Sequence, residues 1–186
     1  MSAGTLLQPA LLSAEAFAER PDPGYPEELV RGEIVPGTFS KPRQGQICTE
    51  VVFLLGRHLD EHDLGRVVIN TGVITERGPD TVRGADVAFY GDERVPKGPL
   101  PNSYLAVPPD LVFEVRRPSD RWPAVIAKVG EYLEAGVSVV VVLDDERRSA
   151  QVFDANGETR VLGAQDKLTF GNLLPGFSVA TGRSFD

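Results

Sequence analysis

Two acidic residues in apolar surroundings are the side chains of this sequence best suited to chemistry. Glu114 lies inside the apolar segment Leu111–Arg116, which we predict to be a buried β-strand. An ionised carboxylate in such a strand costs several kcal/mol unless a cation or hydrogen-bond donors compensate it. We expect Asp86 to end a turn of small residues and to open a second apolar strand over residues 86–90. Acids that converge from neighbouring strands are typical of Mg²⁺ sites, because this ion prefers oxygen ligands and binds through one or two carboxylates.

Asp110 is a third acid of interest, since it lies four residues before Glu114 and is expected on the same face of the strand. It could serve the site as an auxiliary acid, or it could only brace the start of the strand after two prolines. The sequence leaves both roles open. Glu114 also has a structural alternative, which is an ion pair with Arg116 of its own strand or with Arg31.

Lys128 is the candidate cation of the site. The helix that we predict after the acidic strand carries an apolar stripe, and Lys128 lies about 100° from the centre of that stripe. Its amine can therefore reach inward while its stem packs on apolar surface, although a lysine that only extends to solvent from a helix border fits the same pattern. A lysine beside metal-binding acids can orient or deprotonate a water molecule, or stabilise a phosphate during phosphodiester hydrolysis.

Hydrophobic spacing predicts the elements that would position these side chains. The expected helices cover 12–19, 43–61 and about 120–135, and the expected strands cover 28–35 with Gly32 near a turn or bulge, 67–75, 86–90, 111–116, 139–143, 150–153 and 167–170. The apolar run 139–143 is typical of a strand that is covered on both faces. Helices that alternate with strands indicate an α/β (α+β) fold, a mixed central sheet with helices on its faces.

Composition limits the class of protein. The chain has 186 residues, which suits a single domain over 1–186, with an N-terminal helix and loop in 1–26. The net charge of −8 argues against a protein that passively coats nucleic acid, but a local basic groove can exist on an acidic body. A single cysteine and the absence of a long apolar segment favour a cytoplasmic protein without a membrane span.

A set of short motifs resembles the Uma-type putative restriction endonucleases of bacteria, a branch of the PD-(D/E)XK nuclease superfamily. The resemblance extends from about residue 28 to residue 176. The motifs are Glu28-Leu29 with Gly32-Glu33, Leu64-Gly65-Arg66-Val67-Val68, Asp86-Val87-Ala88-Phe89, Pro109-Asp110-Leu111-Val112-Phe113-Glu114-Val115 with Pro118-Ser119, Lys128 with Tyr132 and Gly136-Val137, Leu143-Asp144, and Leu174-Pro175-Gly176.

The resemblance implies a restriction-endonuclease-like fold and assigns roles to individual residues. Asp86 and Glu114 would be the two metal-binding acids, and the carbonyl of Val115 would be a third ligand. Lys128 would replace the lysine that the superfamily places two residues after the second acid, where this chain has Arg116. Glu28 would be an auxiliary acid.

Three departures from the family pattern lie close to the expected site. The chain has Ala85 where a proline is usual, Gln44 where a histidine is common, and Arg116 in place of the lysine.

Three functions follow as hypotheses. The first is an endonuclease that hydrolyses DNA with Mg²⁺ or Mn²⁺, in which Arg116 and Arg117 contact the phosphate backbone. The departures motivate the second, a catalytically inactive relative that binds or scaffolds. The acidic net charge motivates the third, a metal hydrolase that acts on another substrate. A homodimer is compatible with duplex cleavage, which needs two active sites or one site that acts twice.

Overall fold

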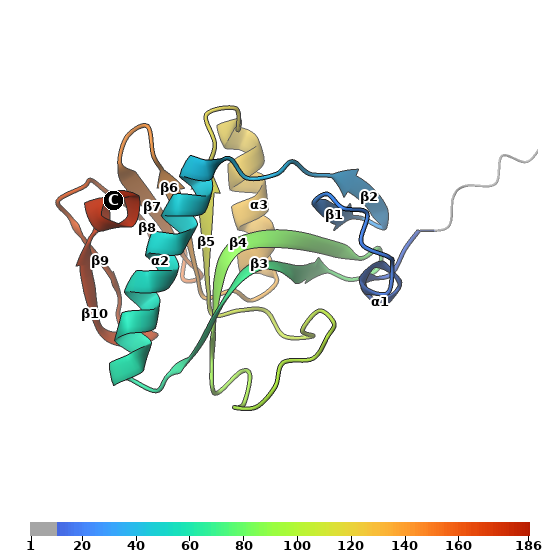
Figure 1. The fold of residues 1–186 in the computed structure, drawn as a ribbon, viewed down its shortest axis with the longest axis horizontal. Coiled ribbons are helices and arrows are strands. Elements are labelled where there is room, and N and C mark those ends of the chain that lie inside the picture. The colour runs from blue at the N-terminus through green and yellow to red at the C-terminus, as the bar shows by residue number, and fades with distance from the viewer. Residues whose placement is uncertain (1–10) are drawn as a thin grey trace, which may run out of the picture.

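The central element of the fold is a mixed eight-stranded sheet (Figure 1). The computed structural model describes residues 11–186 of the chain. The elements, in chain order, are α1 (Ala14–Ala18), β1 (Glu27–Val30), β2 (Glu33–Pro36), α2 (Pro42–Glu61), β3 (Gly65–Glu76), β4 (Thr81–Gly91), β5 (Leu111–Arg116), α3 (Trp122–Glu134), β6 (Val139–Asp144), β7 (Ser149–Asp154), β8 (Thr159–Leu162), β9 (Lys167–Phe170), β10 (Leu174–Ala180) and the 3₁₀ helix η1 (Thr181–Phe185). The strand order is β2-β1-β4-β5-β6-β7-β8, and β3 pairs with β4 off this path. This is the mixed sheet flanked by helices that the sequence predicts.

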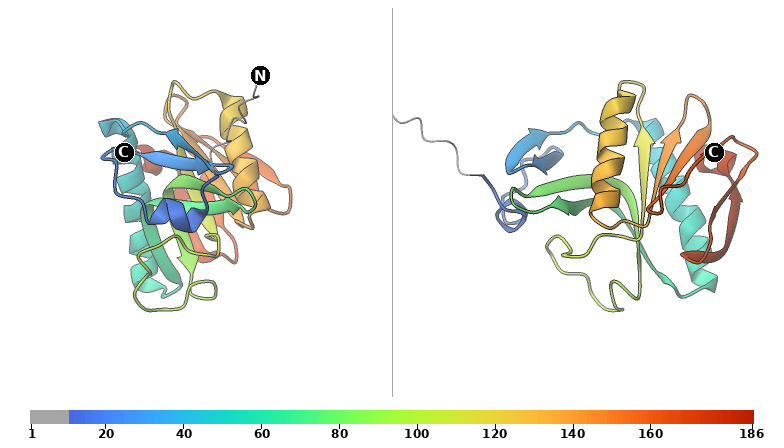
Figure 2. Two further views of the ribbon diagram at one scale, coloured as in Figure 1. Left: turned by 90° about the vertical axis from the view of Figure 1, so that its right-hand side faces the viewer. Right: turned by 180° about the vertical axis from the view of Figure 1, so that it is seen from behind.

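The two faces of the sheet are covered by different helices, because successive side chains of a strand point to opposite faces. Phe113 of β5 packs with Val51 and Leu55 of α2 on one face. Its neighbour Val112 packs with Val129 of α3 on the other face. Figure 2 shows α3 lying across the face opposite to α2. Strand β6 is buried along its whole length, as its unbroken apolar sequence predicts.

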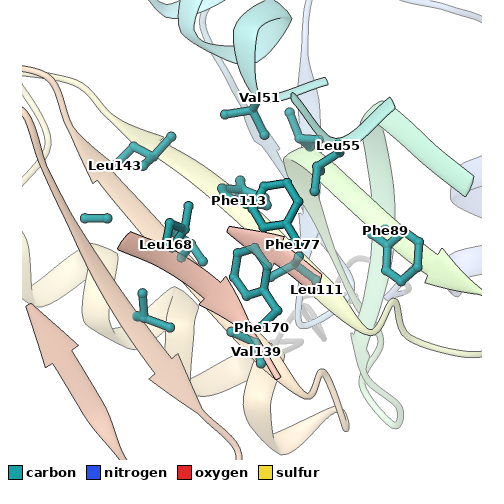
Figure 3. Packing of buried hydrophobic residues seen from close by; sticks show 14 of the residues in the cluster. Val51, Leu55, Phe89, Leu111, Phe113, Val139, Leu143, Leu168, Phe170 and Phe177 are labelled. Carbon is teal, nitrogen blue, oxygen red and sulfur yellow. The ribbon is translucent and has the colours of Figure 1, made fainter. Parts of the chain in front are cut away.

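A second, two-stranded sheet of β9 and β10 extends the core on the α2 side. Phe170 and Phe177 from these strands pack with Phe113 at the centre of the cluster (Figure 3). The rings of Phe113 and Phe170 meet edge to face, with their centroids 5.8 Å apart. Such pairs add to the gain from burial, so the C-terminal part of the chain holds the centre of β5 in place.

Helix α3 connects β5 to β6, which are the one parallel pair among the strands of residues 11–186. Parallel strands need a crossover connection, so α3 must run back across the sheet. Its sequence suits this role, because Pro123 lies in the first turn and Gly136 follows the helix with a φ of 100°. The crossover places the helix over the strand that carries Glu114.

The segment 28–35 forms a hairpin, so the prediction of one strand over this range is wrong, while the predicted turn or bulge near Gly32 is confirmed. Strands β1 and β2 pair in antiparallel fashion around Arg31 and Gly32, whose φ angles are 51° and 79°. Two successive positive φ angles are the requirement of a two-residue hairpin turn. Glycine meets this requirement readily and arginine does not. The sequence therefore indicates the turn at Gly32 but not at its first residue, Arg31.

Strand β4 begins at Thr81, so the prediction that Asp86 ends a turn of small residues is also wrong. Gly84 and Ala85 pair with Gly72 and Thr71 of β3 and lie inside the strand. The long ladder with β3 provides hydrogen-bond partners for the backbone groups of these small residues. The local sequence cannot indicate this pairing. Asp86 therefore projects from the middle of a strand.

The N-terminal helix is shorter than the predicted 12–19. It covers Ala14–Ala18, and its first turn is capped by Ser13, whose side chain accepts a hydrogen bond from the Ala16 amide at 3.1 Å. The part of the predicted N-terminal segment that precedes residue 11 lies outside the described residues. None of the helices in the described part of the chain has the length and apolarity that crossing a membrane requires.

Asp110 braces the start of β5. It accepts a hydrogen bond from the Gly91 amide at 2.8 Å and forms a 2.6 Å ion pair with Arg94. Arg94 also donates to the carbonyls of Pro108 and Gly136, at 3.1 Å and 2.9 Å. Arg94 thus joins the long loop between β4 and β5 to the end of α3.

We expect Arg94→Ala to lower the free energy of unfolding by about 3 kcal/mol, because it leaves the buried carboxylate of Asp110 without its cation. Chemical denaturation measures the change. Arg57→Ala, at an exposed position of α2, is the control and should change stability by less than about 0.5 kcal/mol. A loss for Arg94→Ala as small as that of the control would contradict the bracing role.

Candidate active site

The predicted site residues meet where β4 changes its partner strand. Residues 87–89 of β4 pair with β5, but Val82 pairs with Leu29 of β1. The sheet therefore opens between these two pairings, and Asp86 lies at the opening. A cleft of about 1180 Å³ begins there, lined by the β1–β2 hairpin, β4, the end of β5 and the first half of α3.

Asp86 is held by a strand of its own sheet and by helix α2. Its Oδ2 accepts a hydrogen bond from the backbone amide of Val115 in β5 at 2.7 Å. From the first turn of α2, Gln44 directs its side-chain amide at the same carboxylate, with Nε2 at 3.2 Å from Oδ1 and 3.3 Å from Oδ2. The bond to Val115 brings the Asp86 carboxylate to the residue after Glu114, near enough for its charge to raise the pKa of Glu114.

Glu114 is an acid with two donors from one helix. Lys128 Nζ lies 2.9 Å from its Oε2, and the hydroxyl of Tyr132 donates to its Oε1 at 2.9 Å. Burial raises the pKa of Glu114 to about 7, and the negative charge of Asp86 acts in the same direction, while Lys128 and Tyr132 partly oppose the rise. Tyr132 remains a donor because burial and the charge of Glu114 raise the pKa of its hydroxyl well above the usual value.

Lys128 faces the site and not bulk solvent. Besides Glu114, it contacts the Gly84 carbonyl at 2.8 Å and Glu28 Oε1 at 3.4 Å. Burial by itself lowers the pKa of Lys128, but the carboxylates of Glu114 and Glu28 outweigh burial and raise it above the usual value. The amine is therefore a cation at neutral pH.

Glu28 enters the site from β1. It accepts hydrogen bonds from the Gly84 amide and from Arg83, each at 2.9 Å. Burial tends to raise the pKa of Glu28, but Lys128 and these donors outweigh that effect and hold the pKa below its usual value. Arg83 continues the network to Glu131 of α3, at 2.7 Å. Charges from β1, β4 and α3 thus alternate along one wall of the cleft.

Two predicted residues are not drawn into this cluster. Asp110 lies at the opposite end of β5, in the contacts with Gly91 and Arg94 described above. Arg116 lines the cleft but pairs with Asp144 and Glu146, both at 3.2 Å. The ion pairs that were the structural alternative for Glu114 are absent from the described residues, because Arg116 has these other partners and Arg31 pairs with Glu76.

The sequence assigned no role in the site to three residues that contribute to it, namely Gln44, Arg83 and Tyr132. Tyr132 follows Lys128 by four residues, so the helical period places both on one face, and this signal could have identified it. Gln44 was visible only as a departure from the family pattern. Nothing local marks Arg83, whose partners come from distant segments.

The donor set fits a hard divalent cation. Asp86 and Glu114 supply carboxylate oxygens at one point of the sheet, and the buried Oε1 of Gln44 beside them has no hydrogen-bond partner. Within residues 11–186, no three His, Cys, Asp or Glu side chains group as metal ligands. Around a cation held by these two carboxylates, neutral oxygens and water would complete the shell, which is the arrangement that Mg²⁺ accepts.

Comparisons with known proteins bear on the fold and the family. The family model Uma2, described as putative restriction endonuclease, matches residues 14–182. A similar solved structure is that of a putative nuclease from Anabaena variabilis ATCC 29413, with a TM-score of 0.80 and 16% sequence identity, covering 94% of this chain and 97% of that chain. No curated protein matches the sequence. At this identity the structural likeness establishes the shared fold.

We expect the metal-free protein to lose stability from Glu114 as the pH rises from about 4.5 to about 7. The pKa of Glu114 is about 7 in the folded chain, compared with 4.5 for an unburied glutamate. Between these two pH values the folded state therefore binds more protons than the unfolded state. The contribution of Glu114 to the free energy of unfolding is fully present below the lower pKa and is lost as the pH rises through the higher pKa. The loss is on the order of 3 kcal/mol.

Denaturation of wild type and Glu114→Gln across pH 5 to 8 measures this effect, because the difference between the two proteins removes contributions from other groups. Wild type should lose stability relative to the variant as the pH rises. A difference that stays constant over this range would contradict the raised pKa.

Proposed function

Since the chain belongs to the Uma2 family of putative restriction endonucleases, we propose that it is a metal-dependent DNA endonuclease that uses Asp86, Glu114 and Lys128. The observation that carries the proposal is the placement of two carboxylates from adjacent strands at the floor of an open cleft, with a lysine amine 2.9 Å from one of them. In this proposal Asp86, Glu114 and the carbonyl of Val115 hold Mg²⁺ or Mn²⁺.

The metal, when bound, would supply Lewis acidity toward the phosphate and would lower the pKa of a water molecule for attack. Lys128 serves as a phosphate-stabilising cation, because its amine faces the cleft and, in the metal-free site, Glu114 and Glu28 hold its pKa above the usual value. Tyr132 and Lys128 fix the Glu114 carboxylate in one orientation. Glu28 keeps the amine of Lys128 at the cleft.

Arginines on the rim of the cleft are proposed to contact the DNA backbone. Arg117 donates to Thr38 at 2.6 Å across the cleft, and 41% of its side chain is exposed. Arg121 is exposed on the same side and also lines the cleft. Arg116 is the weaker candidate for this contact, because two acids, Asp144 and Glu146, pair with it and only 12% of its side chain is exposed. Within the described residues, Arg117 pairs with one acid alone, Asp120. Binding through these residues should weaken as salt is added.

An inactive, DNA-binding relative is the second candidate. It is favoured by Arg116 in the position of the superfamily's lysine and by the ion pair in which Lys128 already compensates Glu114. Calorimetric titration separates the candidates, because an inactive site should show no Mg²⁺ or Mn²⁺ binding in the millimolar range. The homodimer and the cytoplasmic location stay predictions.

We expect Asp86→Ala and Glu114→Ala each to reduce Mn²⁺-dependent cleavage of plasmid DNA by about 10³-fold, because each removes a metal ligand. Lys128→Met should reduce the cleavage rate by about 10²-fold through loss of phosphate stabilisation. Asp154→Asn, at the far end of β7, is the matched acid control and should cleave like wild type. If Asp86→Ala and Glu114→Ala both cleave at the wild-type rate, the assignment is wrong.

A further inference from the structure

Gln44 contacts the Asp86 carboxylate through the nitrogen of its side-chain amide, while the amide oxygen makes no hydrogen bond within the described residues. Its Nε2 is 3.2 Å and 3.3 Å from the two carboxylate oxygens. Hydrogen bonds from nitrogen to a charged carboxylate are normally shorter, about 2.7 to 2.9 Å when the donor is also charged. The contact is therefore a loose one that partly offsets the charge of Asp86.

The amide oxygen of Gln44 is the unusual atom of this contact. This Oε1 atom is buried and has no hydrogen-bond partner within the described residues. A buried acceptor without a partner costs about 1 to 3 kcal/mol. This oxygen is therefore available to a cation or a donor that comes within its reach.

Rotation of the amide about its last torsion exchanges Oε1 and Nε2, since the two atoms are nearly equivalent in shape. After this exchange Oε1 would lie about 3.2 Å from both oxygens of Asp86. Ligands at 2.0 to 2.1 Å from an octahedral Mg²⁺ are about 3.0 Å apart when they are neighbours. The spacing of Gln44 and Asp86 thus matches one edge of such a shell.

We propose that Gln44 is a further ligand of the divalent cation, through its side-chain oxygen, and that it turns its amide from donor to acceptor when the cation binds. The inference rests on the proposed metal-dependent function and adds a residue to its site. An amide suits both states, because its NH₂ group covers the bare carboxylate and its oxygen faces the bound cation. It also adds a ligand without adding charge to a site that already contains Asp86, Glu114 and Glu28.

Cys48 is the other side chain of α2 near these acids, one turn after Gln44. Burial, together with the charges of Asp86 and Glu114, raises the pKa of its thiol to about 12. The thiol is therefore neutral, and neutral sulfur is a poor ligand for a hard cation. This leaves Gln44 as the contribution of α2 to the cation.

The test is a calorimetric titration of Mn²⁺ alone into wild type, Gln44→Met and the control Gln46→Met. Methionine keeps the length of glutamine but has no amide. Gln46 lies in the same turn of α2 but is exposed and donates to the Asp186 carbonyl. Gln44→Met should bind Mn²⁺ at least about tenfold more weakly than wild type, and Gln46→Met should bind like wild type.

The direction of the change decides between a ligand and a mere donor. If Gln44 only donates to Asp86, it competes with the cation, so Gln44→Met would bind Mn²⁺ equally or more tightly, and this result would overturn the inference. It would leave the proposed function intact, whereas a wild-type protein that binds no Mn²⁺ would overturn both.

Gln44→Glu is a second variant that keeps an oxygen and removes the donor. We expect it to bind Mn²⁺ at least as tightly as wild type and to have a lower melting temperature without metal, because Asp86 then faces another carboxylate. Weaker Mn²⁺ binding by Gln44→Glu, with the fold intact, would overturn the inference even if Gln44→Met failed to fold.

Discussion

The burial of Glu114 beside Asp86 is the constraint on which the site depends. Two carboxylates at the edge of an apolar core repel each other and are poorly solvated, as the raised pKa of Glu114 shows. Lys128 and Tyr132 compensate this acid, and they can do so only if α3 crosses back over β5. The parallel pairing of β5 and β6 is therefore a requirement of the site as well as a feature of the fold.

The cleft has its origin in the change of partner along β4. The strand leaves β5 and turns toward β1, and this opens the sheet at Asp86, while β3 keeps the same register with β4 on both sides of that residue. The β1–β2 hairpin then brings Glu28 to Lys128, and the first turn of α2 brings Gln44 to Asp86. Five segments, β1, α2, β4, β5 and α3, therefore converge on one point.

Much of the fold and part of the site could be predicted. Apolar period identified α2, β5, α3 and β6, and the resemblance to the Uma-type family is confirmed by the match over residues 14–182. Asp86, Glu114, Lys128 and Glu28 are brought together, while their catalytic roles stay predictions. A turn near Gly32 was expected, but the reversal into a hairpin was not, because arginine rarely adopts the positive φ that Arg31 has. Asp110 shares the strand of Glu114 but lies beyond the cleft.

The sequence by itself determined which segments are helical or extended and which side chains are chemically able to bind a cation, because these properties depend on local period and residue type. Only the tertiary structure decided the partners: Gln44 with Asp86, Arg83 with Glu28 and Glu131, and Arg116 with Asp144 in place of Glu114. Such pairs join residues tens of positions apart. Their geometry follows from strand order and helix placement, and no local pattern encodes either.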